Sequence, residues 1–176
     1  DLNYRKNLWT REKAGQIMAR LMPYVDLCVA NEEDASDVFG IRAEHTDISG
    51  GKLNHEGYAS VAQQLIERFG FQKVAVTLRT SKSADDNDWA GMLYSGGEAQ
   101  FSRTYPIHIV DRVGGGDSFC AGLIYALTKG KTDRDALEFA VAASCLKHTI
   151  EGDYNLVSVS EVEKLAGGDG SGRVQR

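Results

Sequence analysis

The chain is poor in proline and cysteine and has no long hydrophobic run. Its 176 residues include two prolines and three cysteines. Cys28, Cys120 and Cys145 form no C-x-x-C pair and lie among apolar neighbours, which predicts buried free thiols rather than disulfides or a zinc site. No apolar run approaches the roughly 20 residues that span a bilayer, and no signal-peptide pattern opens the chain. These absences predict a cytoplasmic protein with no membrane partner.

An excess of positive charge is also absent. The chain has 20 Lys and Arg residues against 25 Asp and Glu residues, for a net charge of −5. Because a surface that binds nucleic acid is normally basic, nucleic acid is not expected as a partner. With 42% hydrophobic residues, the chain is long enough and apolar enough to bury one ordinary globular core.

Two common nucleotide motifs are excluded by their spacing. Gly130-Lys131-Thr132 matches the end of a P-loop, but the glycine required five positions earlier is replaced by Tyr125. A dinucleotide fingerprint that starts at Gly114 would need a glycine where Phe119 stands. Any nucleotide site in this chain must therefore be of another kind.

Apolar strand patterns alternate with helical patterns between residues 10 and 165. We expect a hairpin of strands 89–95 and 99–105, and we expect Asp85, Asp86 and Asp88 to lie in a solvated loop. The alternation predicts an α/β fold with a doubly wound, mostly parallel sheet. The other expected strands are 26–30, 73–78 and 107–110, and the expected helices are 10–22, 31–39, 55–69, 116–129, 133–149 and 160–165.

Three consecutive glycines, Gly114, Gly115 and Gly116, stand directly before Asp117 at the start of an amphipathic helical pattern. The first amide N–H groups of a helix have no partner within the helix and face the positive end of its dipole, so they favour an anion such as phosphate. Asp117 is placed to accept a proton from a hydroxyl group that attacks the phosphate. The pattern indicates a kinase. The alternative is a glycine-rich loop that only turns into a helix.

The run Asp111-Arg-Val-Gly-Gly-Gly-Asp117 resembles the C-terminal signature of the ribokinase-like (PfkB) carbohydrate kinases. The resemblance implies that the amides of 114–116 form an anion hole for the transferred phosphoryl group and that Asp117 is the catalytic base. It also implies a ribokinase-like fold, with ATP and Mg²⁺ as cofactors. As in some family members, Asp111 would help to hold a monovalent cation; alternatively, it only caps the loop.

Asn31, Glu32 and Asp34 directly follow a predicted strand, where open α/β sheets place ligand-binding residues. The family has an Asn-x-x-Glu motif here that acts on the nucleotide phosphates and their Mg²⁺. The resemblance implies a phosphate contact for Asn31 and a metal role for Glu32 and Asp34, although Asp34 replaces the usual, longer glutamate. The alternative is a helix cap followed by acids that favour the helix dipole.

Four further positions match the nucleotide site of the family. Thr77 and Arg79 stand where the family often has Thr-x-Gly beside the nucleotide phosphates, with arginine in place of the glycine. Arg79 would pair with a phosphate, or it is simply an exposed charge. Ser144 and His148 match the segment around the adenine pocket. A packed core helix with a histidine at its end explains these two residues equally well.

The N-terminal segment suggests the sugar. Asp1-x-Asn3-x-Arg5 resembles the D-x-N-x-R segment of the 2-keto-3-deoxygluconate kinases, in which the arginine holds an acidic sugar. A guanidinium group binds a carboxylate through two hydrogen bonds, and a neutral sugar offers no such partner. Asn3, Arg5 and Asp117 are therefore the expected sugar-binding residues. The alternative is that Arg5 is an ordinary surface arginine.

The expected protein is a homo-oligomeric kinase that uses ATP to convert 2-keto-3-deoxygluconate to its 6-phosphate. Residues 1–166 would form the C-terminal nucleotide-binding and catalytic portion of a ribokinase-like domain, and the glycine-rich segment 167–176 a flexible tail. Because Asp1 opens the chain without a methionine, we expect a missing N-terminal part, without which the fragment is inactive and tends to associate. Two alternatives remain: a kinase for a neutral sugar or nucleoside, and a non-catalytic nucleotide-binding or interaction module.

Overall fold

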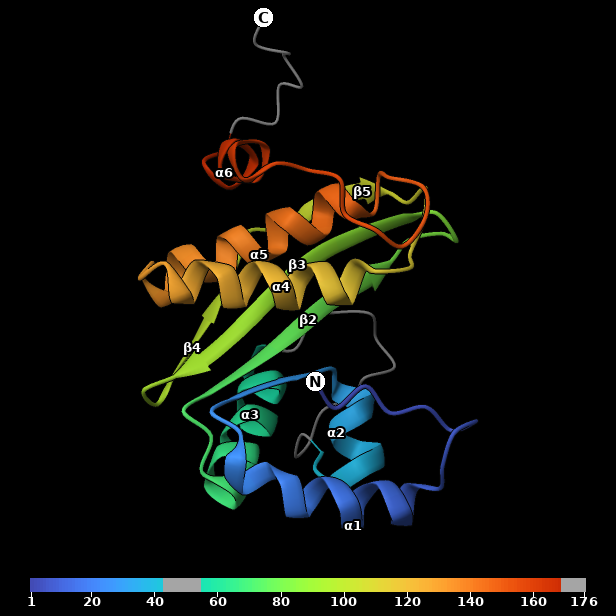
Figure 1. Cartoon of the computed structure of the whole chain (residues 1–176), viewed down its shortest axis with the longest axis vertical. Helices are drawn as coiled ribbons and strands as arrows, with labels where there is room; N and C mark the ends of the chain where they lie inside the picture. Colours follow the sequence, from blue (N-terminus) through green and yellow to red (C-terminus); the bar gives the residue numbers. More distant parts are fainter. Residues whose placement is uncertain (43–54, 169–176) are drawn as a thin grey trace, which may run out of the picture. The chain divides into compact units, whose positions relative to one another are not determined.

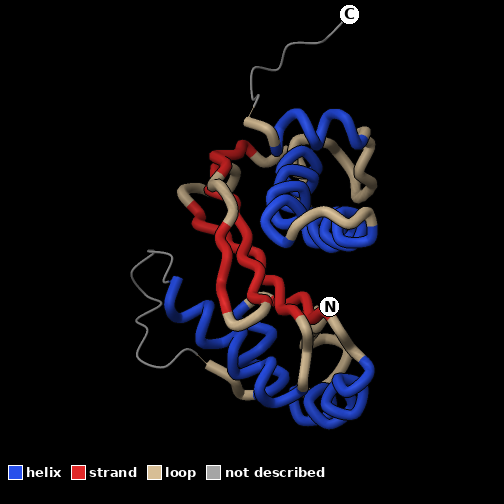
Figure 2. The backbone as a smooth tube through the Cα atoms, turned by 90° about the vertical axis from the view of Figure 1, so that its left-hand side faces the viewer, coloured by secondary structure: helices blue, strands red, loops and turns tan. Residues whose placement is uncertain are grey.

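The computed structural model describes residues 1–42 and 55–168 of the chain. These residues form two compact units, Asp1–Thr80 with Gly91–Phe101, and Ser81–Ala90 with Ser102–Arg176 (Figures 1 and 2). Most of the predicted tail, residues 169–176, lies outside the description. The first of these is unit 1 and the second is unit 2.

Unit 1 contains three helices, α1 (Arg11–Leu21), α2 (Glu32–Phe39) and α3 (His55–Phe69). The Thr10 side chain caps α1, and the short 3₁₀ helix Met22–Tyr24 follows it. Asn31 caps α2, which ends at Gly40 with a φ of 69°. Both caps satisfy backbone N–H groups that a helix leaves free at its start.

The strands of unit 1 are β1 (Leu27–Ala30), β2 (Lys73–Ser81), the C-terminal half of β3 (Asp86–Ser95) and β4 (Glu98–Phe101). They follow the order β1-β2-β3-β4. β1 and β2 are parallel, and their register pairs Ala30 with Val76. β3 and β4 form the expected antiparallel hairpin around Gly96 and Gly97, which have φ values of 60° and 86°.

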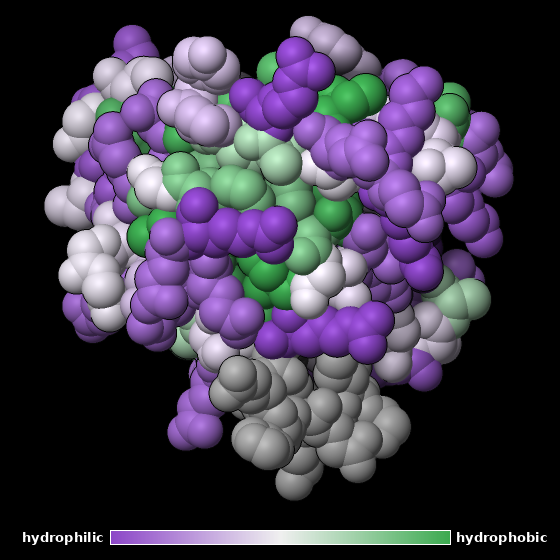
Figure 3. All heavy atoms as spheres, turned by 90° about the horizontal axis from the view of Figure 1, so that it is seen from below, coloured by the Kyte–Doolittle hydropathy of each residue, from purple (hydrophilic) through white to green (hydrophobic). Residues whose placement is uncertain are grey.

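The core of unit 1 forms where the apolar faces of its helices and the strands β1 and β2 are buried. Ala14, Ala62, Leu65, Val74 and Ala75 are fully buried there. Figure 3, which views the molecule of Figure 1 from below, shows hydrophilic side chains around a patch of apolar surface on that face. Helices that are apolar on one face bury that face in the core.

In unit 2, β5 (Tyr105–His108) pairs antiparallel with the first half of β3, opposing Asp86 to His108. The helices are α4 (Gly115–Thr128), α5 (Asp133–Lys147) and α6 (Val159–Ala166). α4 and α5 lie side by side and run in opposite directions, so the start of α4 and the end of α5 share one end of the pair (Figure 1). Gly122 permits this packing, because a β-carbon there would lie 3.1 Å from the Cα of Ala140.

The α/β fold class is confirmed, with a mixed sheet in which β1 and β2 are parallel and β5 and β4 pair antiparallel with β3. Several details of the predicted strands were wrong, including the strand expected at 99–105, because β4 ends at Phe101 and Tyr105 begins β5. The strand expected to end at residue 78 continues to Ser81, and Asp86 and Asp88 belong to β3 rather than to a loop. The strand expected at 107–110 instead ends at His108. In the ranges that the structure describes, no helix has the length and apolar character needed to cross a bilayer.

Replacing Gly122 by leucine should separate α4 from α5. The new side chain would have to displace the backbone of Ala140 and the Cβ of Ala143, which lies 3.2 Å from the added β-carbon. Overpacking of this kind costs about 1–3 kcal/mol of unfolding free energy, measurable by urea denaturation. Ala121→Leu on the exposed side of the same helix is the control and should change stability by less than about 0.5 kcal/mol. Equal losses in the two variants would contradict the packing described here.

Candidate active site

The first turn of α4 presents free backbone amides. Gly114 is the N-cap residue with a φ of 80°, a conformation that favours glycine. The N–H of Gly115 donates to the carbonyl of Arg112 at 3.2 Å. Among the hydrogen bonds of the described residues, none uses the N–H of Gly116 or of Asp117. Two such amides at a helix N-terminus form a site for an anionic oxygen.

The three glycines are required for different physical reasons. A β-carbon at Gly114 would collide with the carbonyl oxygen of Asp153, and one at Gly115 would lie 2.6 Å from Cε1 of the His148 ring. At Gly116 a β-carbon would meet no protein atom within 4 Å. The sequence suggested one reason for all three glycines, namely close approach of a ligand. In the structure, only Gly116 leaves space that the protein itself does not use.

Ser144 and His148 pack against the first turn of α4 and contact Gly115. The buried Ser144 hydroxyl donates to the carbonyl of Gly115 at 2.7 Å. The His148 side chain is only 4% exposed, and its Nδ1 donates to the carbonyl of Ser144 at 2.7 Å. The Trp89 ring lies 4.6 Å from the His148 ring, centroid to centroid. Direct nucleotide contact by Ser144 and His148 stays a prediction; their observed contacts support the loop.

The Asp111 carboxylate joins the loop to the turn that follows α5. Oδ1 accepts the N–H of Val113 and Oδ2 accepts the N–H of Gly152, both at 2.9 Å. These two N–H groups lower the pKa of the Asp111 carboxyl group, and the positive charge of Lys147 lowers it further. The geometry therefore matches the loop-capping alternative for Asp111.

Asn155 and Trp89 support the site, and sequence reasoning assigned neither of them a role. Nδ2 of Asn155 donates to Oγ of Ser118 at 2.6 Å and to the carbonyl of Ala143 at 3.2 Å, so it joins α4 to α5. Its place shortly after His148, which matches the segment around the adenine pocket of the family, was the available signal. Trp89 had none, because its approach to His148 depends on how β3 packs against α5.

Asp117 is the exposed carboxylate of this turn. It is the third residue of α4, next to the free amide of Gly116. Within residues 1–42 and 55–168, no hydrogen bond or ion pair engages its side chain. The carboxylate is therefore free to accept a proton from a hydroxyl group brought to the anion site.

In unit 1, the parallel register brings two of the predicted phosphate contacts together. Because Ala30 pairs with Val76, Asn31 and Thr77 follow at the same edge of the β1-β2 pair. Arg79 lies on the same face of β2 as Thr77 and is exposed. Oδ1 of Asn31 accepts the N–H of Asp34 at 2.8 Å, so Asn31 also has the capping role that was the alternative.

The N-terminal segment lies against the start of α2. The N–H of Leu2 donates to the carbonyl of Val29, and the N–H of Tyr4 donates to Oδ1 of Asp34 at 3.1 Å. Asn3, between them, has a φ of 38°, in the left-handed region that side chains rarely adopt. The neighbouring Arg5 is exposed, and its guanidinium group donates to the carbonyl of Tyr4. Asp34 thus positions the segment that contains Asn3 and Arg5, two of the three predicted sugar-binding residues.

Asp34 is poorly suited to reach a metal ion. It is only 7% exposed, and burial raises the pKa of its carboxyl group, while the N–H of Tyr4 lowers it. The Glu32 side chain lies outside the described residues. Among those that are described, no group of three or more His, Cys, Asp and Glu side chains is arranged to hold a metal ion. Asp111, the third predicted metal ligand, accepts the N–H groups of Val113 and Gly152.

Alanine at Gly115 and alanine at Gly116 should have opposite effects. Gly115→Ala should lower the unfolding free energy by about 1–3 kcal/mol, because its methyl group must displace the His148 ring. Gly116→Ala meets open space and should raise it by up to about 1 kcal/mol through better helix propensity. Urea denaturation of both variants measures the difference. The double variant Gly115→Ala/His148→Ala tests the cause, because removing the ring should abolish the clash; a full loss in the double variant would contradict it.

Similar proteins include kinases of keto-deoxy sugars. The chain is 33% identical over 171 residues to the 2-dehydro-3-deoxygalactonokinase of Haloferax volcanii, covering 96% of this chain and 47% of that protein. The crystal structure of 2-dehydro-3-deoxygluconokinase from Thermotoga maritima superposes with a TM-score of 0.87 at 48% identity, over 94% of this chain and 48% of that one. A PfkB family carbohydrate kinase from Listeria grayi superposes with a TM-score of 0.80 at 33% identity, over 94% and 48%.

The chain spans about half the length of these relatives. Residues 1–170 match the family described as pfkB family carbohydrate kinase. This match covers both units, including the glycine loop of unit 2 and the Asn31 region of unit 1. The fold, the loop and the relatives therefore agree, and the chain belongs to the PfkB family of carbohydrate kinases.

Proposed function

We propose that the protein transfers the terminal phosphoryl group of ATP to a hydroxyl group of an acidic keto-deoxy sugar, most specifically 2-keto-3-deoxygluconate, to give the 6-phosphate. The observation that supports it best is the free Asp117 carboxylate beside the unpaired amides of Gly116 and Asp117. A proton acceptor and an anion site within one helical turn are the two parts that phosphoryl transfer to an alcohol requires.

Asp117 acts as the general base. Its carboxylate accepts the proton of the acceptor hydroxyl as that oxygen attacks the phosphorus atom. The amides of Gly116 and Asp117 donate hydrogen bonds to the negative charge on the phosphoryl oxygens, and they are already oriented before the reaction begins. Ser144 and His148 keep these amides in place through their contacts with Gly115.

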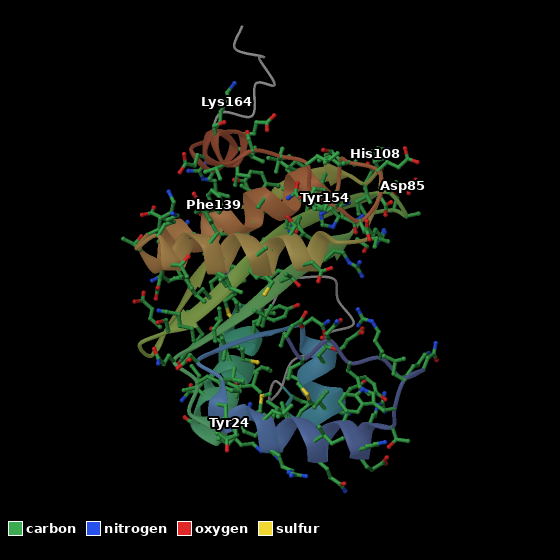
Figure 4. The ribbon with its side chains drawn as sticks, viewed as in Figure 1. Tyr24, Asp85, His108, Phe139, Tyr154 and Lys164 are labelled. Atoms are coloured by element: carbon green, nitrogen blue, oxygen red, sulfur yellow. The ribbon has the colours of Figure 1, made fainter. Side chains whose placement is uncertain are left out.

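The nucleotide phosphates fit the residues of unit 1 that lie just beyond the paired part of β1 and β2. The side chains of Asn31 and Thr77 offer polar atoms, and Arg79 offers a positive charge, at the edge where parallel strands end. Bound Mg²⁺ would neutralise phosphate charge during transfer. Glu32 is the remaining candidate to act on it, because Asp34 holds the N-terminal segment instead. In unit 2, Val113 and Tyr154 leave apolar surface exposed beside the loop for the nucleobase (Figure 4 shows Tyr154).

An acidic sugar is the preferred acceptor because of Arg5. Its guanidinium group is exposed, and the strained turn at Asn3 and the hydrogen bond from Tyr4 to Asp34 hold its backbone. Strain of this kind is found mainly at functional sites. The names of the relatives, kinases of 2-dehydro-3-deoxygluconate and 2-dehydro-3-deoxygalactonate type, support an acid as the substrate.

Asp117→Asn in the full-length protein should abolish most of the catalysis and leave nucleotide binding intact. The amide has the size of the carboxylate but cannot take a proton, so kcat should fall by about 10²–10⁴-fold. The Kd for ATP should change by less than about threefold, because backbone amides supply the phosphate contacts. Coupled kinase assays and isothermal titration calorimetry give the two values.

The matched control is Asp135→Asn, since Asp135 is also an exposed aspartate at the third position of its helix, α5. Its kcat should equal that of the unmodified protein. A near-normal kcat for Asp117→Asn would show that Asp117 is not the base and that the proposed mechanism is wrong.

Arg5→Met should separate acidic from neutral sugars. Loss of hydrogen bonds between charged groups should raise the KM for 2-keto-3-deoxygluconate by about 10–100-fold. Any activity on a neutral sugar such as ribose should not change. Arg20→Met, which removes an exposed arginine at the end of α1, is the control. Efficient phosphorylation of a neutral sugar, with no effect of Arg5→Met, would instead favour a neutral-sugar kinase.

A further inference from the structure

We infer that the ammonium group of Lys147 is the resident cation of the glycine loop, and that the loop needs no monovalent metal ion at Asp111. Lys147 is the last residue of α5, and it is 0% exposed. Its Nζ donates to the carbonyl oxygen of Ile150 at 3.1 Å. A lysine charge is rarely buried, and where it is buried it needs groups of opposite polarity around it.

The Lys147 ammonium stabilises the turn on which the loop depends. Ile150, which accepts its hydrogen bond, opens the segment 150–153. In that segment, Gly152 donates to Oδ2 of Asp111, and the carbonyl of Asp153 lies directly against Gly114. The carbonyl of His148 also accepts the N–H groups of Val110 and Asp111, at 2.8 and 3.3 Å. Every one of these contacts lies within unit 2.

Asp111 is already engaged by the protein. Each of its carboxylate oxygens accepts a backbone N–H group, which leaves only part of its acceptor capacity, and each of these bonds fixes one end of the loop or the turn. A second cation at Asp111 would also be repelled by Lys147, whose charge already acts on this carboxylate. Among the ion pairs within 4 Å in the described ranges, none includes Lys147, so no carboxylate in direct contact neutralises that repulsion.

The same charge favours an anion at the start of α4. The turn 150–153 links the two: the Lys147 ammonium donates to the carbonyl of Ile150, and the carbonyl of Asp153 in the same turn lies against Gly114 at the start of α4. Lys147 is then a positioning residue that acts through the turn, rather than a group that touches the substrate. The effect of Lys147 on catalysis rests on the proposed function, whereas its effect on the structure of the loop does not.

The test compares salts as well as variants, in the full-length protein at equal ionic strength. The melting temperature and the Kd for ATP are measured in potassium chloride and in tetramethylammonium chloride, whose cation is too large to bind between the loop and the turn. The unmodified protein should give the same two values in both salts. A clear gain in melting temperature or ATP affinity on adding potassium would overturn the inference.

Two variants at position 147 then test the charge itself. In tetramethylammonium chloride, Lys147→Met and Lys147→Ala should melt earlier and bind ATP about tenfold more weakly or worse, as expected for the loss of a charged hydrogen bond. Ammonium or potassium ions should restore part of the loss in Lys147→Ala, which leaves room for an ion, and little of it in Lys147→Met. Lys129→Met, at an exposed lysine after α4, should behave like the unmodified protein.

The outcomes are separable. A Lys147→Ala loss that neither ion reverses would make Lys147 a packing residue and overturn the inference, as would a Lys147→Met protein that behaves like the unmodified one. If the alanine variant does not fold, the salt comparison on the unmodified protein and the methionine variant still decide. If ATP binds in no salt, the proposed function fails, and the melting temperatures alone test Lys147.

Discussion

The close approach of the His148 ring to the backbone of Gly115 is the contact on which the candidate active site depends. The ring occupies the space where any other residue would place a β-carbon. The Gly115 carbonyl is held from the same side by Ser144. With the backbone fixed in this way, the next two amides, those of Gly116 and Asp117, are left without a partner among the described residues, and the Asp117 side chain is exposed on the same turn. The proposed catalytic groups are thus positioned by the buried residues Ser144 and His148.

The two units contribute different chemistry, and each does so at the end of a strand or the start of a helix. In the proposed function, unit 2 supplies the base and the anion site from the start of α4. Unit 1 supplies polar and basic side chains directly after β1 and on β2 beyond its pairing with β1. Free backbone groups at a helix start bind anions without long basic side chains, so the net negative charge of the chain does not exclude the proposed phosphate sites.

Local patterns in the sequence were sufficient for the elements and for the chemistry at their ends. The helix 55–69 was predicted with its observed bounds, and the glycines before Asp117 indicated a helix N-terminus. The strand β2 was predicted too short because its last residues are polar, and they are held by the hairpin with β3, where Ser81 bonds to Asn87. A polar strand end of this kind has the local pattern of a loop.

Such local patterns could not predict the long-range contacts of the site. The side chain of Asp34 meets the backbone of residue 4 across 30 positions, and the ring of Trp89 meets His148 across the packing of β3 on α5. The tertiary fold gives each residue a role that its type does not suggest. An aspartate in this position suggests a metal ligand, and a tryptophan suggests an ordinary core residue. The resemblance to the family indicated candidate site residues, and the structure separates the exposed ones, such as Asp117, from the buried ones, such as Ser144 and His148.

The buried Asp34 has a thermodynamic consequence for unit 1. Because burial raises its pKa in the folded state, the folded protein binds this proton more tightly than the unfolded chain does. The stability gained from Asp34 is therefore fully present below the usual aspartate pKa and is lost as the pH rises through the raised value. The same carboxyl group accepts the N–H of Tyr4, beside the turn at Asn3. The group that holds the N-terminal segment therefore also makes the stability of unit 1 depend on pH.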